Sequence, residues 1–351
     1  VDAVETQITP TTKVNEPKLV VQNKSLTLLE KRKKLIENKK QKKAKKQNVK
    51  AISPSDTEIT ILLEHYQNGQ YDEAEKLAKS ITQEFPAHQF GWKVLGSVLK
   101  KTGRVSESLV ASQKSVQLVP QDAEAHSNLG NTLQELGRLD EAKTSFMQAI
   151  ALKPDFAEAH NNLGNTLQEL GRLDEAETSC RQAIALKPDF AEAYNNLGNT
   201  LKELGRLDEA EVSYTQAIAL KPDFAGAQSN LGGTLQELGR LDEAETSCRQ
   251  AIALKPDFAD AHYNLGVTLK ELGRLDEGEA SYRQAIELKP DYAEAHNNLG
   301  NTLQELGRFD EVLASYTQAI ALKLDYAEAH SNLGNTLKEL GRLDEALASY
   351  T

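Results

Sequence analysis

One string of residues recurs along this chain at a constant spacing. Residues 162–177 read NLGNTLQELGRLDEAE, and close copies begin at 128, 196, 230, 264, 298 and 332. A fixed period of this length predicts an array of stacked supersecondary units rather than a chain folded around one core. From Ser55 the 34-residue units, without insertion or deletion, are 55–88, 89–122, 123–156, 157–190, 191–224, 225–258, 259–292, 293–326 and a partial 327–351.

Each unit carries the apolar pattern of two helices. In 157–190 both halves place apolar and small side chains on one helical face. One such pair cannot bury both of its faces alone, so the units are expected to stack on one another. The face residues are Ala159, Leu163, Thr166, Leu167 and Leu170 in the first half, and Leu173, Ala176, Cys180, Ala183, Ile184 and Leu186 in the second.

Helix boundaries are predicted from turn and capping residues. Gly171 is expected to end the first helix of its unit, and Pro188 the second. Asp189 and Glu192 form a D-x-x-E arrangement that resembles a capping box for the next unit. Leu324 stands where the other units have this proline, so a sharp helix end is not assured there.

Small residues are expected to set the distance between helices. Gly164 and Ala176 lie at positions where the two helices of a unit would approach closely, and Ala183 would admit the next unit. A bulky residue at Gly164 should therefore cost about 1–3 kcal/mol through overpacking. The sequence predicts an all-α fold, a right-handed α-solenoid of helix-turn-helix units.

This pattern resembles the tetratricopeptide repeat family. The first two units depart from it, because His65 replaces the leucine at the Leu167 position and Ser108 the alanine at the Ala176 position. Gly278 also replaces that alanine. In unit 157–190 the family's signature residues fall on Leu163, Gly164, Leu167, Gly171, Ala176, Ala183 and Pro188.

The resemblance implies that the first helix of each unit lines the concave inner surface. Residues three or four apart share a helix face, so Glu158, Asn161, Asn162 and Asn165, together with Glu169, are expected to point there. An asparagine amide both donates and accepts, which suits sequence-tolerant pairing with an extended peptide. The predicted peptide-binding residues are Asn128, Asn131, Asn162, Asn165, Asn196, Asn199, Asn230, Asn264, Asn298, Asn301, Asn332 and Asn335.

The array is similar to the repeat arm of protein O-GlcNAc transferases and to that of bacterial multidomain tetratricopeptide proteins. In the transferases such an asparagine ladder holds the peptide backbone, and the resemblance implies the same role here. Asn162 and Asn165 are then residues that the fold itself is not expected to require. Because the units look like recent duplicates, a passive scaffold or a helix–helix assembly surface remain alternatives.

The charges beside the asparagines limit the class of ligand that we expect. Glu158, Glu192 and Glu294 flank the asparagines, which favours a neutral or basic extended segment over a carboxylate held by lysine and arginine. Gly233 and Val267 replace the second asparagine of their units. We therefore expect a weaker or more flexible groove near 226–267.

Residues 1–54 have the opposite charge from the repeats. They carry 14 Lys or Arg and 5 Asp or Glu, a net charge of +9, whereas residues 55–351 carry 27 against 47, a net charge of −20. A basic tail of this kind is expected to be disordered or partly helical. Its three interpretations are a solvated tail, a weak nonspecific anchor for an anionic partner, and an arm that associates with the acidic repeats.

No residue pattern indicates catalysis, a cofactor or a metal. Cys180 and Cys248 lie 68 residues apart, two repeat periods, which is too far for a disulfide between stacked units. Buried reduced thiols favour a cytoplasmic setting. Five histidines recur once per unit, too widely spaced to share an ion, and are expected to pack in an aromatic position: His126, His160, His262, His296 and His330.

The sequence thus predicts a non-enzymatic module that binds protein segments in its concave groove. The competing hypothesis makes it the substrate-recognition arm of a glycosyltransferase, sulfotransferase or methyltransferase whose catalytic domain lies beyond residue 351, because the last unit stops within its pattern. No apolar run reaches the length of about 18 residues that a membrane helix needs. We expect a monomer, with self-association through the open C-terminal repeat as the alternative.

Overall fold

The computed structural model describes residues 32–37, 39 and 53–349. The chain divides into two compact units, Val1–Pro54 and Ser55–Thr351. In the first unit the described residues 32–37 and 39 are helical. The interpretations of the basic tail therefore concern a segment that lies mostly outside the described residues.

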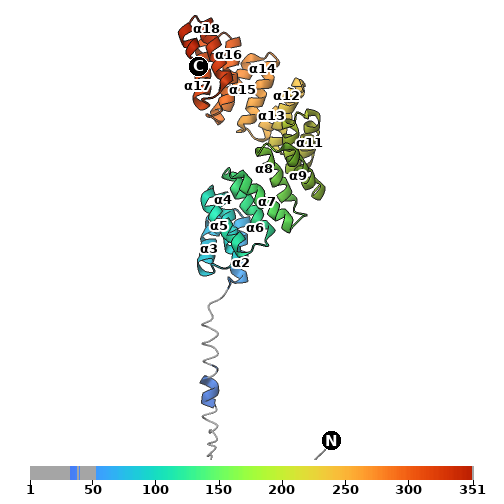
Figure 1. Cartoon of the computed structure of the whole chain (residues 1–351), viewed down its shortest axis with the longest axis vertical. Helices are drawn as coiled ribbons and strands as arrows, with labels where there is room; N and C mark the ends of the chain where they lie inside the picture. The colour runs from blue at the N-terminus through green and yellow to red at the C-terminus, as the bar shows by residue number, and fades with distance from the viewer. Residues whose placement is uncertain (1–31, 38, 40–52, 350–351) are drawn as a thin grey trace, which may run out of the picture. The chain divides into compact units, whose positions relative to one another are not determined.

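The second unit is built from helices, and its described residues 55–349 contain no strand (Figure 1). Consecutive helices pack antiparallel in pairs, and each pair packs on the next. The helices are α2 (Asp56–Gln67), α3 (Tyr71–Glu84), α4 (Gln89–Lys101), α5 (Val105–Leu118), α6 (Ala123–Glu135), α7 (Leu139–Leu152), α8 (Ala157–Glu169), α9 (Leu173–Leu186), α10 (Ala191–Glu203), α11 (Leu207–Leu220), α12 (Ala225–Glu237), α13 (Leu241–Leu254), α14 (Ala259–Glu271), α15 (Leu275–Leu288), α16 (Ala293–Glu305), α17 (Phe309–Leu322), α18 (Ala327–Glu339) and α19 (Leu343–Ser349).

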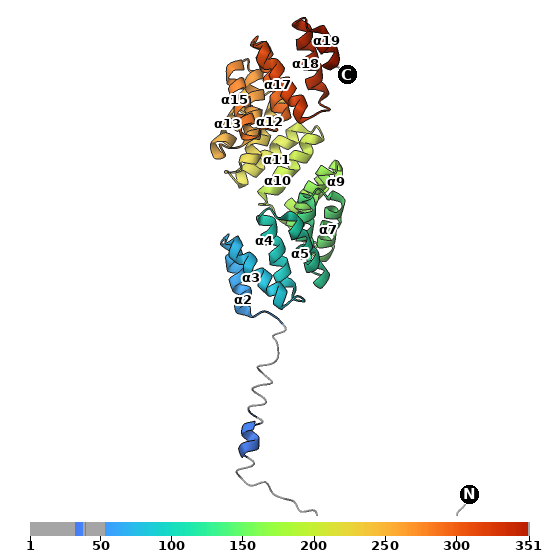
Figure 2. The same ribbon diagram turned by 90° about the vertical axis from the view of Figure 1, so that its left-hand side faces the viewer.

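The array bends toward one set of helices. The even-numbered helices, here called first helices, contact the first helices of neighbouring units, as α8 contacts α10. Figure 2 shows the same array of helix pairs after a quarter turn. No comparable packing joins successive odd-numbered second helices within residues 53–349. First helices are therefore closer together and line the inner side, while second helices form the outer side. The predicted all-α solenoid of tetratricopeptide repeats is confirmed.

The predicted helix ends are also present. Gly171 follows the last residues of α8 with φ of 70°, a conformation that side chains with a β-carbon rarely adopt. α9 ends at Leu186, directly before Lys187 and Pro188. The doubt about Leu324 is unfounded, since α17 ends at the equivalent Leu322. The turn there is held by a backbone hydrogen bond and not by proline: the N–H of Lys323 donates to the carbonyl oxygen of Ala319 at 3.0 Å. The equivalent bonds of the other units measure 2.8–3.1 Å.

The predicted capping box at Asp189 and Glu192 is wrong. α10 begins at Ala191, so the capping position belongs to Phe190, whose side chain cannot accept a hydrogen bond. The phenyl ring instead lies 4.5 Å from the Lys187 ammonium, a cation–π contact. At the start of α6 the position of Phe190 holds Asp122, whose side chain accepts hydrogen bonds from the backbone.

Close packing within a unit depends on a glycine of the first helix, as predicted. A β-carbon on Gly164 would lie 2.5 Å from Sγ of Cys180 and 3.3 Å from the carbonyl oxygen of Ala176. At Gly198 it would lie 2.6 Å from the ring of Tyr214, which is fully buried. In these two units the second helix therefore fits a core side chain against a bare backbone.

Candidate functional site

The predicted asparagines form two series on the inner first helices. The first series occupies the sixth position of each unit, and all its side chains are half-buried. The second series lies three residues later; it is half-buried except for the exposed Asn335. The first series is Asn128, Asn162, Asn196, Asn230, Asn264, Asn298 and Asn332, and the second is Asn131, Asn165, Asn199, Asn301 and Asn335.

Amide groups of the first series bond across unit boundaries. Nδ2 of Asn162 donates to Oδ1 of Asn131 in the preceding unit at 2.8 Å. Nδ2 of Asn230 donates to both Asn195 and Asn199, at 3.1 and 3.0 Å. The expectation that the fold does not require these asparagines is therefore wrong for the first series, because its amides join consecutive first helices.

Other members of the series find different acceptors in the preceding unit. Asn264 donates to the backbone and hydroxyl oxygens of Ser229, each at 3.1 Å. Asn298 donates to the hydroxyl of Tyr263 at 3.0 Å. The junctions thus keep the bond although the acceptor residue changes. Asn196 and Asn332 donate to Asn161 and Asn297, at 3.0 and 3.1 Å.

Those last two acceptors correct a second expectation. Asn161 was placed in the groove, yet only 6% of its surface is exposed, and the equivalent Asn297 is fully buried. Their position faces the next unit's first helix, where Oδ1 accepts the bond from the first-series amide. They are contacts between units and do not line the groove.

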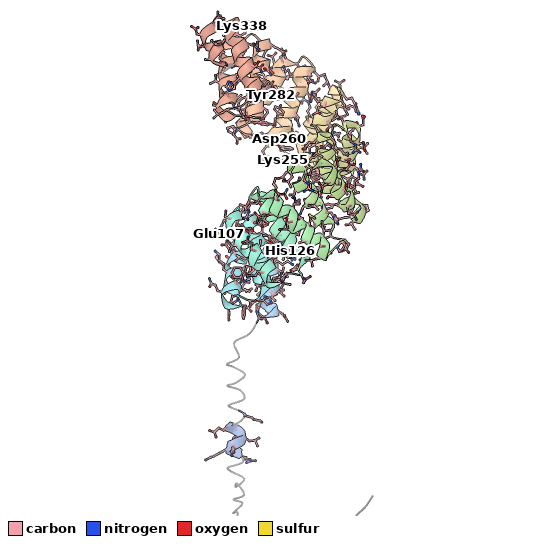
Figure 3. The ribbon with its side chains drawn as sticks, in the orientation of Figure 1. Glu107, His126, Lys255, Asp260, Tyr282 and Lys338 are labelled. Atoms are coloured by element: carbon pink, nitrogen blue, oxygen red, sulfur yellow. The ribbon has the colours of Figure 1, made fainter. Side chains whose placement is uncertain are left out.

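The second series accepts inter-unit bonds at Asn131, Asn199 and Asn301 and also bonds within its own unit. Asn165 donates to Glu169 of its own helix at 2.8 Å. Oδ1 of Asn199 accepts from the buried Tyr214 hydroxyl at 2.8 Å, and Asn301 accepts from Tyr316 at 2.6 Å. This series therefore anchors the core tyrosines at the inner surface. Near the C-terminal end a cavity of about 460 Å³ is lined by Gln304, Asn332, Asn335, Lys338 and Glu339, and Lys338 is marked in Figure 3.

A second inner-side series was missed from the sequence. A glutamine or lysine near the end of each first helix donates to a glutamate 35 residues later, in the next unit; we call this series the glutamate rail. It crosses seven junctions, at 2.6–3.7 Å: Lys100–Glu135, Gln134–Glu169, Gln168–Glu203, Lys202–Glu237, Gln236–Glu271, Lys270–Glu305 and Gln304–Glu339. The regular spacing of Gln or Lys and Glu was a visible signal for it.

The flanking acids carry less unbalanced charge than expected. Glu158 pairs with Lys187 at 3.4 Å, and Glu192 with Lys221 at 3.0 Å. Burial would raise the pKa of Glu192, but the hydrogen bond from Lys221, a backbone hydrogen bond and the charges of Lys221 and Lys187 together outweigh it and lower that pKa. Glu192 therefore remains ionised, and both glutamates have a lysine partner beside them.

The N-terminal end of the inner side has a distinct cavity of about 210 Å³. It opens beside Ser112, a small residue where later units have phenylalanine, cysteine or tyrosine. Lys100 and Lys101 line it together with Asn128 and Asn131. Burial lowers the pKa of Lys100. This end therefore differs in charge from the remaining inner surface.

The recurrent histidines have a structural bonding role. Nε2 of His126, labelled in Figure 3, lies 3.0 Å from the carbonyl oxygen of Pro120, and the other four make the same contact at 3.0–3.3 Å. Nε1 of Trp92 donates to Pro86 from the equivalent position. Each ring thus ties a first helix to the turn before it. Within residues 32–37, 39 and 53–349, no three potential metal ligands come together.

Both cysteines are free and fully buried. Burial raises the pKa of each thiol to about 12, so neither is a thiolate at neutral pH. The described helices include none that is both long and apolar enough to cross a membrane.

Comparisons with known proteins agree with this geometry. The family model described as the cilia and flagella-associated protein 70 C-terminal domain matches residues 27–306, and a tetratricopeptide repeat model matches residues 301–341. Neither description is that of an enzyme family. No curated protein matches the sequence.

A solved structure shares the fold. One chain of the solved structure described as "Crystal structure of APC/C hetero-tetramer Cut9-Hcn1" superposes on this chain with a TM-score of 0.64 at 17% identity. The match covers 76% of this chain and 52% of that one, so this chain spans about half the length of its structural relative. At this identity the likeness concerns the fold alone. The chain belongs to the tetratricopeptide repeat family, through the family model of the cilia and flagella-associated protein 70 C-terminal domain.

Proposed function

We propose that this chain is a protein-interaction scaffold whose inner side binds an extended peptide segment through the first-series asparagines. One observation carries the proposal: these amides recur on successive first helices, half-buried, with hydrogen-bonding capacity left over. At Asn230, Asn264 and Asn332 the amide donates to the preceding unit, while Oδ1 has no donor within residues 53–349. An oxygen held in this way is preorganised to accept from a peptide N–H.

The preferred segment in this proposal is neutral to basic. The glutamate rail supplies a line of carboxylates along the inner side, and the donors that balance it are lysine at some junctions and neutral glutamine at others. Gly233, which replaces a second-series asparagine, lies against Lys202 and Asn264 and supplies no amide, and we propose that the groove is weakest there.

Two subsidiary proposals concern the setting of the protein. Buried, protonated thiols suit a reducing environment, so we propose a cytoplasmic location. We also propose a monomer that self-associates through its C-terminal repeat at high concentration. Leu343 and Leu347 support this, because they are 64% and 68% exposed.

The groove proposal is tested with random 12-residue peptides displayed on phage and selected on the full chain. The variant Asn230→Ala with Asn264→Ala should weaken the selected peptides about tenfold, since two acceptors are removed and each tenfold corresponds to about 1.4 kcal/mol. Asn195→Ala is the matched control, because it removes an inter-unit acceptor of Asn230 and leaves both groove amides in place.

Thermal unfolding separates binding from stability in this experiment. Both variants should lower the unfolding temperature, because both remove bonds between units. Only the first should lose peptide affinity when binding is measured well below that temperature. Equal peptide affinity of the double variant and the wild type would refute the groove proposal.

A further inference from the structure

The outer side of the solenoid is closed by a repeated ion-pair arrangement, which we call the outer seam. The arginine that precedes a second helix bonds to a glutamate in the second helix of the preceding unit. These glutamates are largely buried, with side-chain exposures of 12–26%, and all five arginines also bond to a glutamate three residues ahead. The seam pairs are Glu75–Arg104, Glu177–Arg206, Glu211–Arg240, Glu245–Arg274 and Glu279–Arg308.

At one junction a cation stands in place of the seam glutamate. In unit 123–156 the glutamate position holds Lys143, the single cation at this position in the eight full units. Its ammonium group pairs with Asp140 of its own helix at 2.9 Å. Arg172, which would meet the missing glutamate, bonds through Nε and Nη2 to Glu175, and its charge helps Lys143 to lower the pKa of Asp140. Within residues 53–349 no carboxylate accepts from its Nη1, the atom that the seam glutamate engages elsewhere.

At the other two positions that lack a seam glutamate, an apolar side chain takes its place. Leu109 and Leu313 stand at the glutamate position of their units, and Leu109 packs against the core cluster that contains Phe146. An apolar side chain at this position therefore closes the gap by burial. Lys143 does not close the gap completely: its side chain is 20% exposed, but its ammonium group bonds to Asp140 of its own helix.

A cavity of about 250 Å³ opens where the seam glutamate is missing. Leu163 and Leu167 of α8 form its apolar part, and Met147 of α7 stands at its mouth with 56% of its surface exposed. Lys143 and Arg172 are the cations of the lining, and Glu175 is the acid. The site thus combines an apolar pocket with two cations that come from different units.

We propose that this cavity binds a protein segment that carries an acidic residue next to an apolar one. The carboxylate takes the place of the missing seam glutamate, bonded to Nη1 of Arg172 and to Lys143, and the apolar side chain enters the cavity above Leu163 and Leu167. Guanidinium–carboxylate pairs are directional, and methionine adapts to the shape of an entering side chain. Since residues 1–54 carry a net charge of +9, the chain's own basic segment does not fit this requirement.

This site is independent of the proposed inner groove, because it lies between second helices on the opposite side of the array. Its ligand chemistry is also different: the groove is proposed to accept neutral or basic backbone, whereas the outer cavity selects acidic side chains. Failure of one proposal therefore leaves the other standing.

The chain itself supplies the variant that should close the cavity. Lys143→Glu with Met147→Arg copies the residues that unit 157–190 has at these positions, Glu177 and Arg181. In that unit Glu177 bonds to both Arg181 and Arg206. The double variant should fold at least as stably as the wild type, because it completes the same network with Arg172.

The test selects random 12-residue phage peptides on the full wild-type chain, with counterselection against the double variant. The expected peptides carry Asp or Glu beside Leu, Ile, Met or Phe, and by fluorescence anisotropy they should bind the double variant at least about tenfold more weakly. They should bind Asn264→Ala normally. The transplant Glu211→Lys with Thr215→Met should restore binding to the closed variant by creating the site in unit 191–224.

Three outcomes would overturn the proposal. Counterselection could enrich no peptide, or the enriched peptides could lack acidic residues. Alternatively, light scattering could show a wild-type dimer that the double variant converts to a monomer, which would identify the occupant as a second copy of this chain.

Discussion

The inner and outer sides of this solenoid join the same units by different chemistry. On the inner side, first helices are linked by neutral amide bonds such as Asn230 to Asn199, at 3.0 Å. On the outer side, second helices are linked by ion pairs such as Glu245 to Arg274, at 2.8 Å. Amide bonds neither titrate in mild acid nor weaken much with salt, whereas the carboxylates of ion pairs are protonated in acid and exposed ion pairs are screened by salt. The two sides should therefore respond differently to solution conditions.

Acidification should produce the largest effect, since it acts on the whole outer seam at once. Burial would raise the pKa of Glu177 and of Glu245, but their arginine hydrogen bonds outweigh it and lower both pKa values below the ordinary 4.5. Their contribution to stability is therefore complete above about pH 4.5 and is lost as the pH falls through the lower folded values. Thermal unfolding at pH 7 and pH 3 measures this loss, and equal midpoints would contradict it.

A β-branched residue inside a unit should destabilise both sides together. In Gly198→Val the new β-carbon would meet the Tyr214 ring at 2.6 Å, so the two helices of the unit must separate. We expect a loss of about 1–3 kcal/mol in the free energy of unfolding, measured by urea denaturation. Gly226→Ala in the same fold is the control, because its nearest contact is the edge of the Phe224 ring at 3.3 Å.

Removal of one inner amide should be the next largest effect. Asn230→Ala deletes two bonds to the preceding unit, each of which contributes about 0.5–1.5 kcal/mol. The loss measured by urea denaturation should be the same at 50 mM and 1 M sodium chloride. A loss that disappears at high salt would show that the inner side is electrostatic in origin.

Removal of one outer ion pair should cost less and should depend on salt. Glu245→Gln keeps the side-chain shape but removes the charge that Arg249 and Arg274 share. Because both arginines are more than a third exposed, we expect about 0.5–1 kcal/mol at low salt and less at 1 M. Urea denaturation at the two salt concentrations measures it, and a loss that does not change with salt would contradict the assignment.

The smallest expected effect is a gain in stability. Lys143→Glu alone gives Arg172 the seam glutamate that five other junctions possess, and should raise the free energy of unfolding by about 0.5 kcal/mol at low salt. Lys143→Gln is the control, since it removes the cation without adding the acid. If both variants are equally stable, the seam glutamate does not bond to Arg172 as it does to the arginines elsewhere.

Much of the fold could be predicted from the sequence, because each repeat contains the turn and packing residues that define its own helix pair. Gly171 marks a turn that requires a positive φ, and Gly164 marks a close approach to Cys180; both are properties of one unit. The predicted capping box failed because a single-residue shift of the helix start moved Phe190 into the capping position. A short acidic pattern does not fix a boundary to that accuracy.

The candidate site was harder to predict from the sequence, because it depends on how each unit is shifted relative to its neighbour. First-series asparagines bond mainly 31 or 35 residues back, not 34, so the bonding partner is not the equivalent residue of the next copy. The same offset creates the glutamate rail and buries Asn161. Periodicity shows which residues recur, but it does not show which recurring residues meet.

The sequence by itself determined the helix pairs, their turns and the solenoid, because a 34-residue period with small residues at fixed positions allows few other ways to bury its apolar faces. Only the tertiary structure decided that the asparagines hold units together, that the outer seam is ionic, and that Lys143 leaves a cavity in it. The physical reason is that these features arise between units, where a displacement of one residue exchanges one bonding partner for another.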